Sequence, residues 1–228
     1  MRKKILRALL VLCFLFTAQG AYNTYGDVSN KDDATWEMTL EGIEPMYGTS
    51  KMGRSQREMD KEVMKLLIEE AGSIKAAVAQ NLKGAWNYYR RGFPRIALRK
   101  FNQAWSLDNN NAEVYFGFGT ILSQEKKTDK AIVMYDKAIK LDPAYFKAYA
   151  NRGLDYANGG NYENAILDFT KAITLEPKEA QTYNDRAVAY FFTEQYDKCR
   201  DDIRQAQQLG YAVHPDFLAE LERLSEKH

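Results

Sequence analysis

The sequence predicts an all-α protein, a solenoid of stacked antiparallel helix hairpins with a C-terminal capping helix. Two observations lead to this fold class. Residues of the same kind recur every 34 positions between residues 78 and 213. Within each copy the apolar residues follow helical spacing, as Ala97, Phe101 and Ala104 do at i, i+4 and i+7. A fixed period of this length indicates supersecondary units that bury their apolar faces against neighbouring copies.

Four columns of side chains carry the period. Two hold small residues, one holds mostly aromatic residues, and one holds leucine. Small side chains allow a neighbouring helix to approach closely, and the aromatic side chain between them fills the space. Each copy is therefore predicted to be a helix hairpin. The columns are Ala97, Ala131, Ala165, Cys199; Phe101, Tyr135, Phe169, Ile203; Ala104, Ala138, Ala172, Ala206; and Leu107, Leu141, Leu175, Leu209.

The period divides the chain into segments. Residues 55–77 hold a predicted lead-in helix with one apolar face, and Gly72 is expected to end that helix. The four copies occupy residues 78–111, 112–145, 146–179 and 180–213. Residues 214–228 begin near Pro215 and carry an apolar stripe through Leu224, as expected of a capping helix that covers the last apolar face.

The N-terminal residues have the pattern of an export signal. Residues 1–20 combine a basic start, an apolar run from Ala8 to Phe16, and small residues before Ala21. We expect cleavage near Gly20 and a periplasmic or secreted mature protein. The alternative is an uncleaved anchor in the inner membrane. Residues 21–54 are polar and without period, so we expect a loosely ordered arm.

Charge and cysteine content argue against nucleic-acid binding, disulfide formation and a redox role. The chain has 32 basic and 31 acidic residues; residues 1–20 contain four cations and no acid, so their removal leaves 28 against 31. A mildly acidic chain is not expected to bind nucleic acid. Only Cys199 remains after cleavage, and it occupies a small-residue column. We interpret it as a buried small apolar residue, without a disulfide or a redox role.

The repeated residues resemble the tetratricopeptide-repeat (TPR) family, whose pattern is W-x2-L-G-x2-Y, then A-x3-F, then P. The copy at 146–179 matches with Tyr149, Arg152, Gly153, Tyr156, Ala165, Phe169, Ala172 and Pro177. The copies at 112–145 and 180–213 are similar, although the last lacks the proline. The copy at 78–111 is the most divergent, with Asn81 and Gly84 at the early positions. We interpret the small residue Gly153 as permitting close helix contact.

The resemblance implies a concave groove, lined by the first helix of each hairpin, that holds a peptide segment or a partner helix. By register, the residues expected there are Lys83, Trp86, Tyr89, Arg90, Phe116, Thr120, Asn151, Asn184, Asp185 and Phe191. Aromatic and amide side chains suit an extended protein segment. The competing interpretation is that many of them pack only against the neighbouring helix. The Lys/Asn/Arg clamp that some relatives use for C-terminal carboxylates is absent, because Phe116 and Thr120 occupy its positions.

The sequence offers little for catalysis. Its histidines are His214 and His228, and it has neither a P-loop nor a G-x-G-x-x-G motif. We therefore expect no catalytic residue, no cofactor and no metal site.

The expected function is that of an adaptor or scaffold for other proteins, in cell-envelope assembly, secretion or pilus biogenesis. A membrane-tethered interaction module is the alternative, and an enzyme is the third possibility. Membrane contact is expected only through the N-terminal segment, and the sequence leaves the oligomeric state open. A basic cluster lies in the first copy: Arg90, Arg91, Arg95, Arg99 and Lys100. It could bind an acidic protein or anionic lipid, or be a solvated face.

Overall fold

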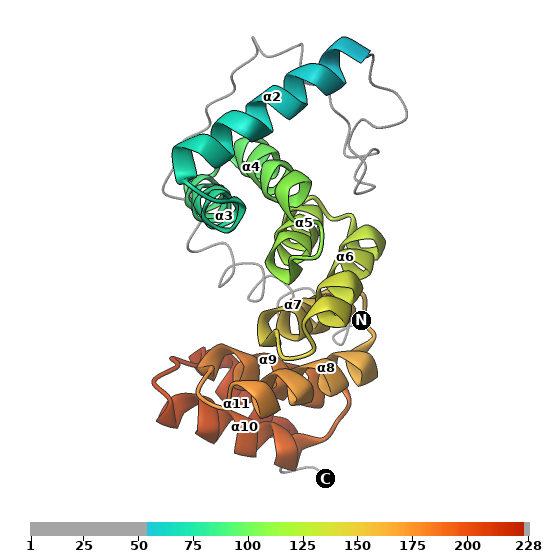
Figure 1. Cartoon of the computed structure of the whole chain (residues 1–228). Coiled ribbons are helices and arrows are strands. Elements are labelled where there is room, and N and C mark those ends of the chain that lie inside the picture. Colours follow the sequence, from blue (N-terminus) through green and yellow to red (C-terminus); the bar gives the residue numbers. More distant parts are fainter. Residues whose placement is uncertain (1–53, 226–228) are drawn as a thin grey trace. The chain divides into compact units, whose positions relative to one another are not determined.

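The computed structural model describes residues 54–225, and every regular element in that range is an α-helix (Figure 1). The chain forms two compact units, which divide after Asn109. The all-α solenoid class is confirmed. The predicted signal peptide at 1–20 and nearly all of the predicted arm at 21–54 lie outside the described residues.

The first unit holds α2 (Arg54–Ala71), α3 (Ile74–Arg90) and α4 (Pro94–Leu107). Gly72, with a φ of +80°, follows α2 directly, a backbone region that glycine enters without steric cost. Ser73 then caps α3, and its hydroxyl accepts a hydrogen bond from the Ala76 amide at 3.2 Å. The lead-in helix was expected to end at Gly72, and this is confirmed. This turn ends it at Ala71, and α3 begins four residues before the predicted start of the first copy.

The second unit consists of three hairpins and a last helix, numbered in chain order. The hairpins pair α5 (Ala112–Gln124) with α6 (Thr128–Leu141), α7 (Phe146–Asn158) with α8 (Tyr162–Leu175), and α9 (Ala180–Phe192) with α10 (Tyr196–Gln208). Helix α11 (Pro215–Ser225) follows, and its residues Phe217 and Leu221 are buried. Consecutive hairpins pack on one another through α6 and α7 and through α8 and α9. None of the helices in residues 54–225 is long and apolar enough to cross a membrane.

The core of each hairpin is the pair of small-residue columns with the mostly aromatic column between them, all buried. Two glycines make room for the rings. A Cβ atom on Gly119 would lie 2.5 Å from Tyr135, and one on Gly153 would lie 2.8 Å from Phe169. The interpretation of Gly153 as a close-contact residue is therefore confirmed. In the last hairpin Ala187 replaces the glycine and the smaller Ile203 replaces the ring.

The leucine column is less buried than the other three, and Leu141 is 39% exposed. Leu107, Leu141 and Leu175 are each the last residue of their helix. Cys199 is fully buried, as predicted, and burial raises the pKa of its thiol to about 12.

Candidate functional site

The first helices of the second unit lie next to one another, and side chains join them directly. We call the surface of α5, α7 and α9 the first-helix face. Asn151 on α7 donates from Nδ2 to the Thr120 hydroxyl on α5 at 3.4 Å and to the Tyr135 hydroxyl at 3.5 Å. The Thr120 hydroxyl in turn donates to the Phe116 carbonyl at 2.9 Å. The structure therefore brings together Thr120 and Asn151, two of the predicted groove residues.

Both of these long contacts are made by the NH2 group of the Asn151 amide. Its NH2 group faces Thr120 and Tyr135. Within the described part of the chain its carbonyl oxygen, Oδ1, accepts no hydrogen bond. Asn151 is only half-buried. An amide that is held through its donor and is open at its acceptor can receive a backbone N–H from another chain.

A buried carboxylate lies one turn further along α7. Asp155 is 3% exposed, and its Oδ1 accepts a hydrogen bond from the Ser123 hydroxyl at 2.6 Å. Its Oδ2 is buried with no hydrogen-bond partner in the described residues. Burial raises the pKa of Asp155 to about 6, although the Ser123 hydrogen bond works in the opposite direction. Burial and this carboxylate also raise the pKa of the Tyr135 phenol.

Asp185 on α9 was predicted to line the groove, but it is 2% exposed. Its carboxylate accepts a hydrogen bond from Gln181 Nε2 at 2.8 Å. Burial raises its pKa to about 7, and hydrogen bonds from Gln181 and Asn184 offset part of this rise. The groove prediction is therefore wrong for Asp185, because the packed helices cover its side chain. Its neighbour Asn184 is half-buried and stays on the first-helix face.

The prediction is also wrong for Phe116 and Phe191, which are buried. The ring of Phe116 packs against Tyr135 and Tyr145, with centroid distances of 6.0 and 5.3 Å. The ring of Phe191 lies 5.2 Å from that of Phe217 on α11. Large apolar side chains at these positions fill the contact with the next helix, as the competing interpretation had it.

The other four predicted residues lie on α3 in the first unit. Lys83 and Arg90 are exposed, whereas Trp86 and Tyr89 are half-buried. The Trp86 ring makes edge contacts with Phe101 at 5.0 Å and Tyr89 at 5.8 Å. Trp86 is thus part of the hairpin packing, and only its outer part is open to a partner.

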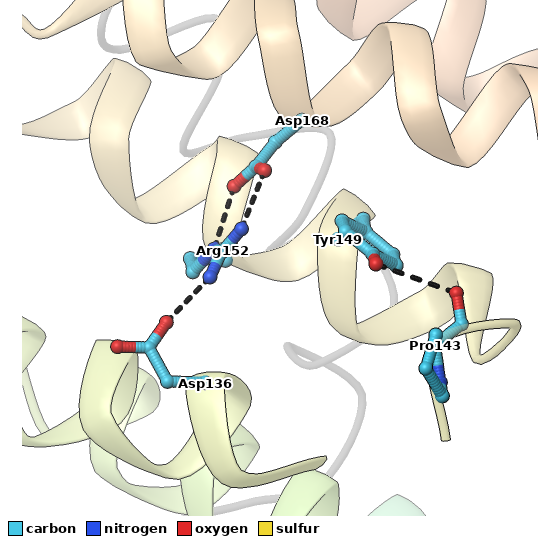
Figure 2. Close-up of polar contacts among 5 residues, drawn as sticks. All are labelled: Asp136, Pro143, Tyr149, Arg152 and Asp168. Atoms are coloured by element: carbon cyan, nitrogen blue, oxygen red, sulfur yellow. Dashed lines mark hydrogen bonds and ion pairs between the residues drawn. The ribbon is translucent and has the colours of Figure 1, made fainter. Parts of the chain in front are cut away.

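A repeated salt bridge on the second unit was not expected from the sequence. Arg152 on α7 donates from Nε and Nη2 to both oxygens of Asp168 on α8, at 2.8 and 2.7 Å (Figure 2). Its Nη1 reaches Asp136 on α6 at 2.5 Å, so one guanidinium joins two hairpins. These charge-assisted bonds raise the pKa of Arg152 further above its already high value, although burial opposes them. In the same view the Tyr149 hydroxyl donates to the Pro143 carbonyl at 3.3 Å.

The same arrangement recurs 34 residues later. Arg186 donates to both oxygens of Asp202 at 2.7 and 2.8 Å and to the Thr170 hydroxyl of the preceding hairpin at 3.0 Å. Each arginine also lies between two tyrosine rings, 5.7–6.0 Å from their centroids. The sequence does contain the pattern that predicts these salt bridges, because the two arginines are 34 residues apart and so are their aspartate partners. It was missed because the family pattern has an apolar residue at the arginine position.

In residues 54–225 the structure groups no three histidine, cysteine, aspartate or glutamate side chains in a way that could hold a metal ion. The expectation that the protein has no metal, no cofactor and no catalytic site stays a prediction.

The fold and this site define a class of protein: a helix-hairpin repeat solenoid in which the first helices of successive hairpins lie side by side. Comparison with known proteins shows which repeats part of the chain is similar to. The model described as "Tetratricopeptide repeat" matches residues 146–179, and the model described as "TPR repeat" matches residues 119–159. The first of these matches has the same bounds as one of the copies predicted from the 34-residue period. Residues 119–179 are therefore similar to tetratricopeptide repeats, and the helix-hairpin fold is of the kind found in protein–protein interaction modules.

Two curated relatives are similar over part of the chain. Human DnaJ homolog subfamily C member 7 is 33% identical over 78 residues, which are 32% of this chain and 16% of that protein. The yeast (Saccharomyces cerevisiae) small glutamine-rich tetratricopeptide repeat-containing protein 2 is 28% identical over 116 residues, 50% of this chain and 34% of that protein. The chain thus matches 16% and 34% of the lengths of these two relatives.

Solved structures of similar fold include MamA from Desulfovibrio magneticus RS-1, with a TM-score of 0.51 and 24% identity. The alignment covers 58% of this chain and 75% of that one. PilF from Pseudomonas aeruginosa has a TM-score of 0.55 and 17% identity, with 70% and 80% covered. At these identities the likeness concerns the fold.

Proposed function

We propose that the chain is an adaptor that binds an extended segment of a partner protein on the first-helix face of its second unit. The observation that carries this proposal is Asn151. Its amide donor is held by Thr120 and Tyr135, and its amide acceptor is open on a half-buried surface. An extended segment has unpaired backbone N–H groups that such an acceptor can receive.

Asn184 lies on α9 one residue before Asp185, the residue that corresponds to Asn151 on α7, and it adds a second half-buried amide one hairpin further on. Its side chain is half-buried and hydrogen-bonds the adjacent Asp185. Two amides on successive first helices can hold one strand-like segment at two places. Lys83 and Arg90 in the first unit are exposed cations that a partner could also contact.

A site-specific photocrosslinker tests this face in cells. Placed at Gln181, which is exposed on α9, the crosslinker should capture a discrete set of proteins, whereas at Lys171 on the outer helix α8 it should not. Asn151→Ala with Asn184→Ala should remove that set while leaving the circular dichroism spectrum unchanged. Capture of the same set from Lys171, or its persistence in the double variant, would contradict the proposal.

We also propose that the protein acts outside the cytoplasm, in envelope assembly, secretion or pilus biogenesis. The support is the basic and apolar pattern of residues 1–20 with small residues before Ala21. The intact mass of the protein isolated from its cells decides between the alternatives. A mass that lacks residues 1–20 supports export with cleavage. A mass that includes them favours a membrane-tethered module.

A further inference from the structure

The charged side chains of the first unit's hairpin, α3 and α4, are all positive. Between Ala71 and Leu107 the sequence contains seven lysine and arginine residues and no aspartate or glutamate. The whole of α3 and α4 lies in this range. The three hairpins of the second unit, in contrast, each mix both signs. The seven cations are Lys75, Lys83, Arg90, Arg91, Arg95, Arg99 and Lys100.

The positive charge is densest where α3 turns into α4. We call residues 90–96 the cationic turn. Arg90, Arg91 and Arg95 are all exposed there, and in the described part of the chain none of them forms an ion pair. Two large apolar side chains are exposed among them, Phe93 at 41% and Ile96 at 42%. The Arg91 guanidinium lies 5.7 Å from the Phe93 ring centroid, so cation and apolar side chain form one surface.

The turn departs from two local preferences that the other hairpins follow. Arg95 lies in the first turn of α4, where the positive end of the helix dipole disfavours a cation. The residues 34, 68 and 102 positions later are Asp129, Glu163 and Asp197, all acidic. Phe93, an apolar residue, stands at the N-cap position of α4.

In the other three hairpins the N-cap position of the second helix holds a polar residue. These residues are Lys127 before α6, Asn161 before α8 and Gln195 before α10. An exposed phenylalanine and a misplaced arginine cost stability at the same turn. Departures of this kind are expected where a surface serves function.

We propose that the cationic turn docks on an anionic phospholipid bilayer. Guanidinium groups bind phosphate oxygens with paired, charge-assisted hydrogen bonds. Phe93 and Ile96 stand among the arginines, where they can enter the boundary between headgroups and acyl chains. A purely electrostatic acidic partner would leave these two side chains unused, and this favours the bilayer over an acidic protein. Several cations near an anionic leaflet bind weakly and reversibly.

An environment-sensitive dye attached at the cationic turn reports contact between the turn and a lipid vesicle, and it does not respond to contacts made elsewhere on the chain. In the full-length Cys13→Ser background, Phe93→Cys is labelled with an environment-sensitive fluorophore; Cys199 is fully buried and does not compete. The control is Lys127→Cys, the equivalent residue of the next hairpin. Vesicles of phosphatidylcholine alone are compared with vesicles containing about 30% phosphatidylglycerol, at about 50 mM and about 500 mM NaCl.

We expect a blue shift at position 93 with anionic vesicles at low salt, and none at position 127. The triple variant Arg90→Gln/Arg91→Gln/Arg95→Gln should lower the partition constant about 100-fold. The matched variant Lys130→Gln/Lys140→Gln/Lys171→Gln removes three exposed cations from other helices and should change it less than about threefold. Circular dichroism checks that each variant is folded.

Three outcomes would overturn the proposal. One is the absence of a shift at position 93 with anionic vesicles. Another is an equal shift with neutral vesicles or at position 127. The third is equal loss in the two triple variants. A parallel titration with polyglutamate and with RNA covers the other anionic partners. A response at position 93 to either of these, with none to vesicles, would assign the turn to that class instead.

Discussion

Arg152 and Asp168 form a two-point salt bridge between the helices of one hairpin, with two nitrogens of the guanidinium facing the two carboxylate oxygens (Figure 2). The side chains are 18% and 9% exposed. One hairpin earlier, the residues at the same positions are Phe118 and Met134, both buried. The fold thus accepts either an ion pair or an apolar pair at this place.

We therefore expect removal of one member of the pair to lower the free energy of unfolding strongly, and replacement of both members by apolar residues to change it little. Arg152→Ala should lower the free energy of unfolding by about 3 kcal/mol, because it leaves the Asp168 carboxylate buried without its partner. Arg152→Phe with Asp168→Met copies the preceding hairpin and should lie within about 1 kcal/mol of wild type. Urea denaturation of wild type and of both variants measures these free energies.

The control is Arg204→Ala, which breaks a pair with Asp201 whose side chains are 69% and 73% exposed. We expect a change of about 0.5 kcal/mol or less there. Equal effects of Arg152→Ala and Arg204→Ala would show that burial does not decide the strength of the pair.

Gly153 and Phe169 are matched in size. A Cβ atom on Gly153 would lie 2.8 Å from the Phe169 ring, so Gly153→Ala should lower the free energy of unfolding by about 1–3 kcal/mol through overpacking. Phe169→Ile in the same chain should restore part of the loss, because Ala187 and Ile203 coexist in the last hairpin. A double-mutant cycle by thermal or urea unfolding gives the coupling. Additive effects would contradict a direct size match.

The turns between paired helices require a left-handed residue at a fixed place. Gly92 and Gly160 supply it with φ near +80°, whereas Lys126 and Glu194, at the equivalent places, are held at +61°. Side chains are strained in this region. Lys126→Gly and Glu194→Gly should therefore each raise the free energy of unfolding by about 0.5–1 kcal/mol. Lys130→Gly, inside α6, is the control and should lower it by about 1 kcal/mol.

Two buried carboxyl groups should make stability depend on pH. The pKa of Asp185 is about 7 in the folded chain and that of Asp155 about 6, both above the ordinary value of 3.8. Folding therefore favours the protonated form. The stabilisation is complete below about pH 4 and is lost as the pH rises through the folded values.

Between pH 5 and about 8 this contribution should lower the midpoint of thermal unfolding by several degrees. Asp185→Asn keeps an oxygen for Gln181 but cannot ionise, so its unfolding midpoint should change less over the same range. The exposed Asp201→Asn serves as the control and should follow wild type. A steeper slope in Asp185→Asn than in wild type would refute the assignment.

Much of the fold could be predicted from side-chain spacing alone. The alanine and aromatic columns, such as Ala131 with Tyr135, recur in register because each hairpin must bury the same face. The end of α2 could also be predicted, because Gly72 interrupts the helical pattern and favours a turn. The start of α3 at Ile74, four residues before the first copy, was not predicted.

The candidate site was harder to predict. The position of a residue within the 34-residue repeat indicates which face of a helix it occupies, but it does not indicate which neighbouring side chains bury it. Thr120, Asn151 and Asn184 stay on that face, whereas Asp185 is enclosed and Phe116 and Phe191 fill contacts with neighbouring helices. A polar side chain at a groove position can be buried when its neighbours are large, and sequence position does not contain that information.

The 34-residue period by itself determined the hairpins, their core columns and the resemblance to the tetratricopeptide repeat, since local spacing and burial repeat together. The tertiary structure alone decided which side chains meet across the hairpins. It placed Arg152 between Asp168 and Asp136, and it oriented the Asn151 amide on Thr120. The physical reason is that a hydrogen bond depends on distance and direction between groups far apart in the chain, whereas helical periodicity depends only on neighbours.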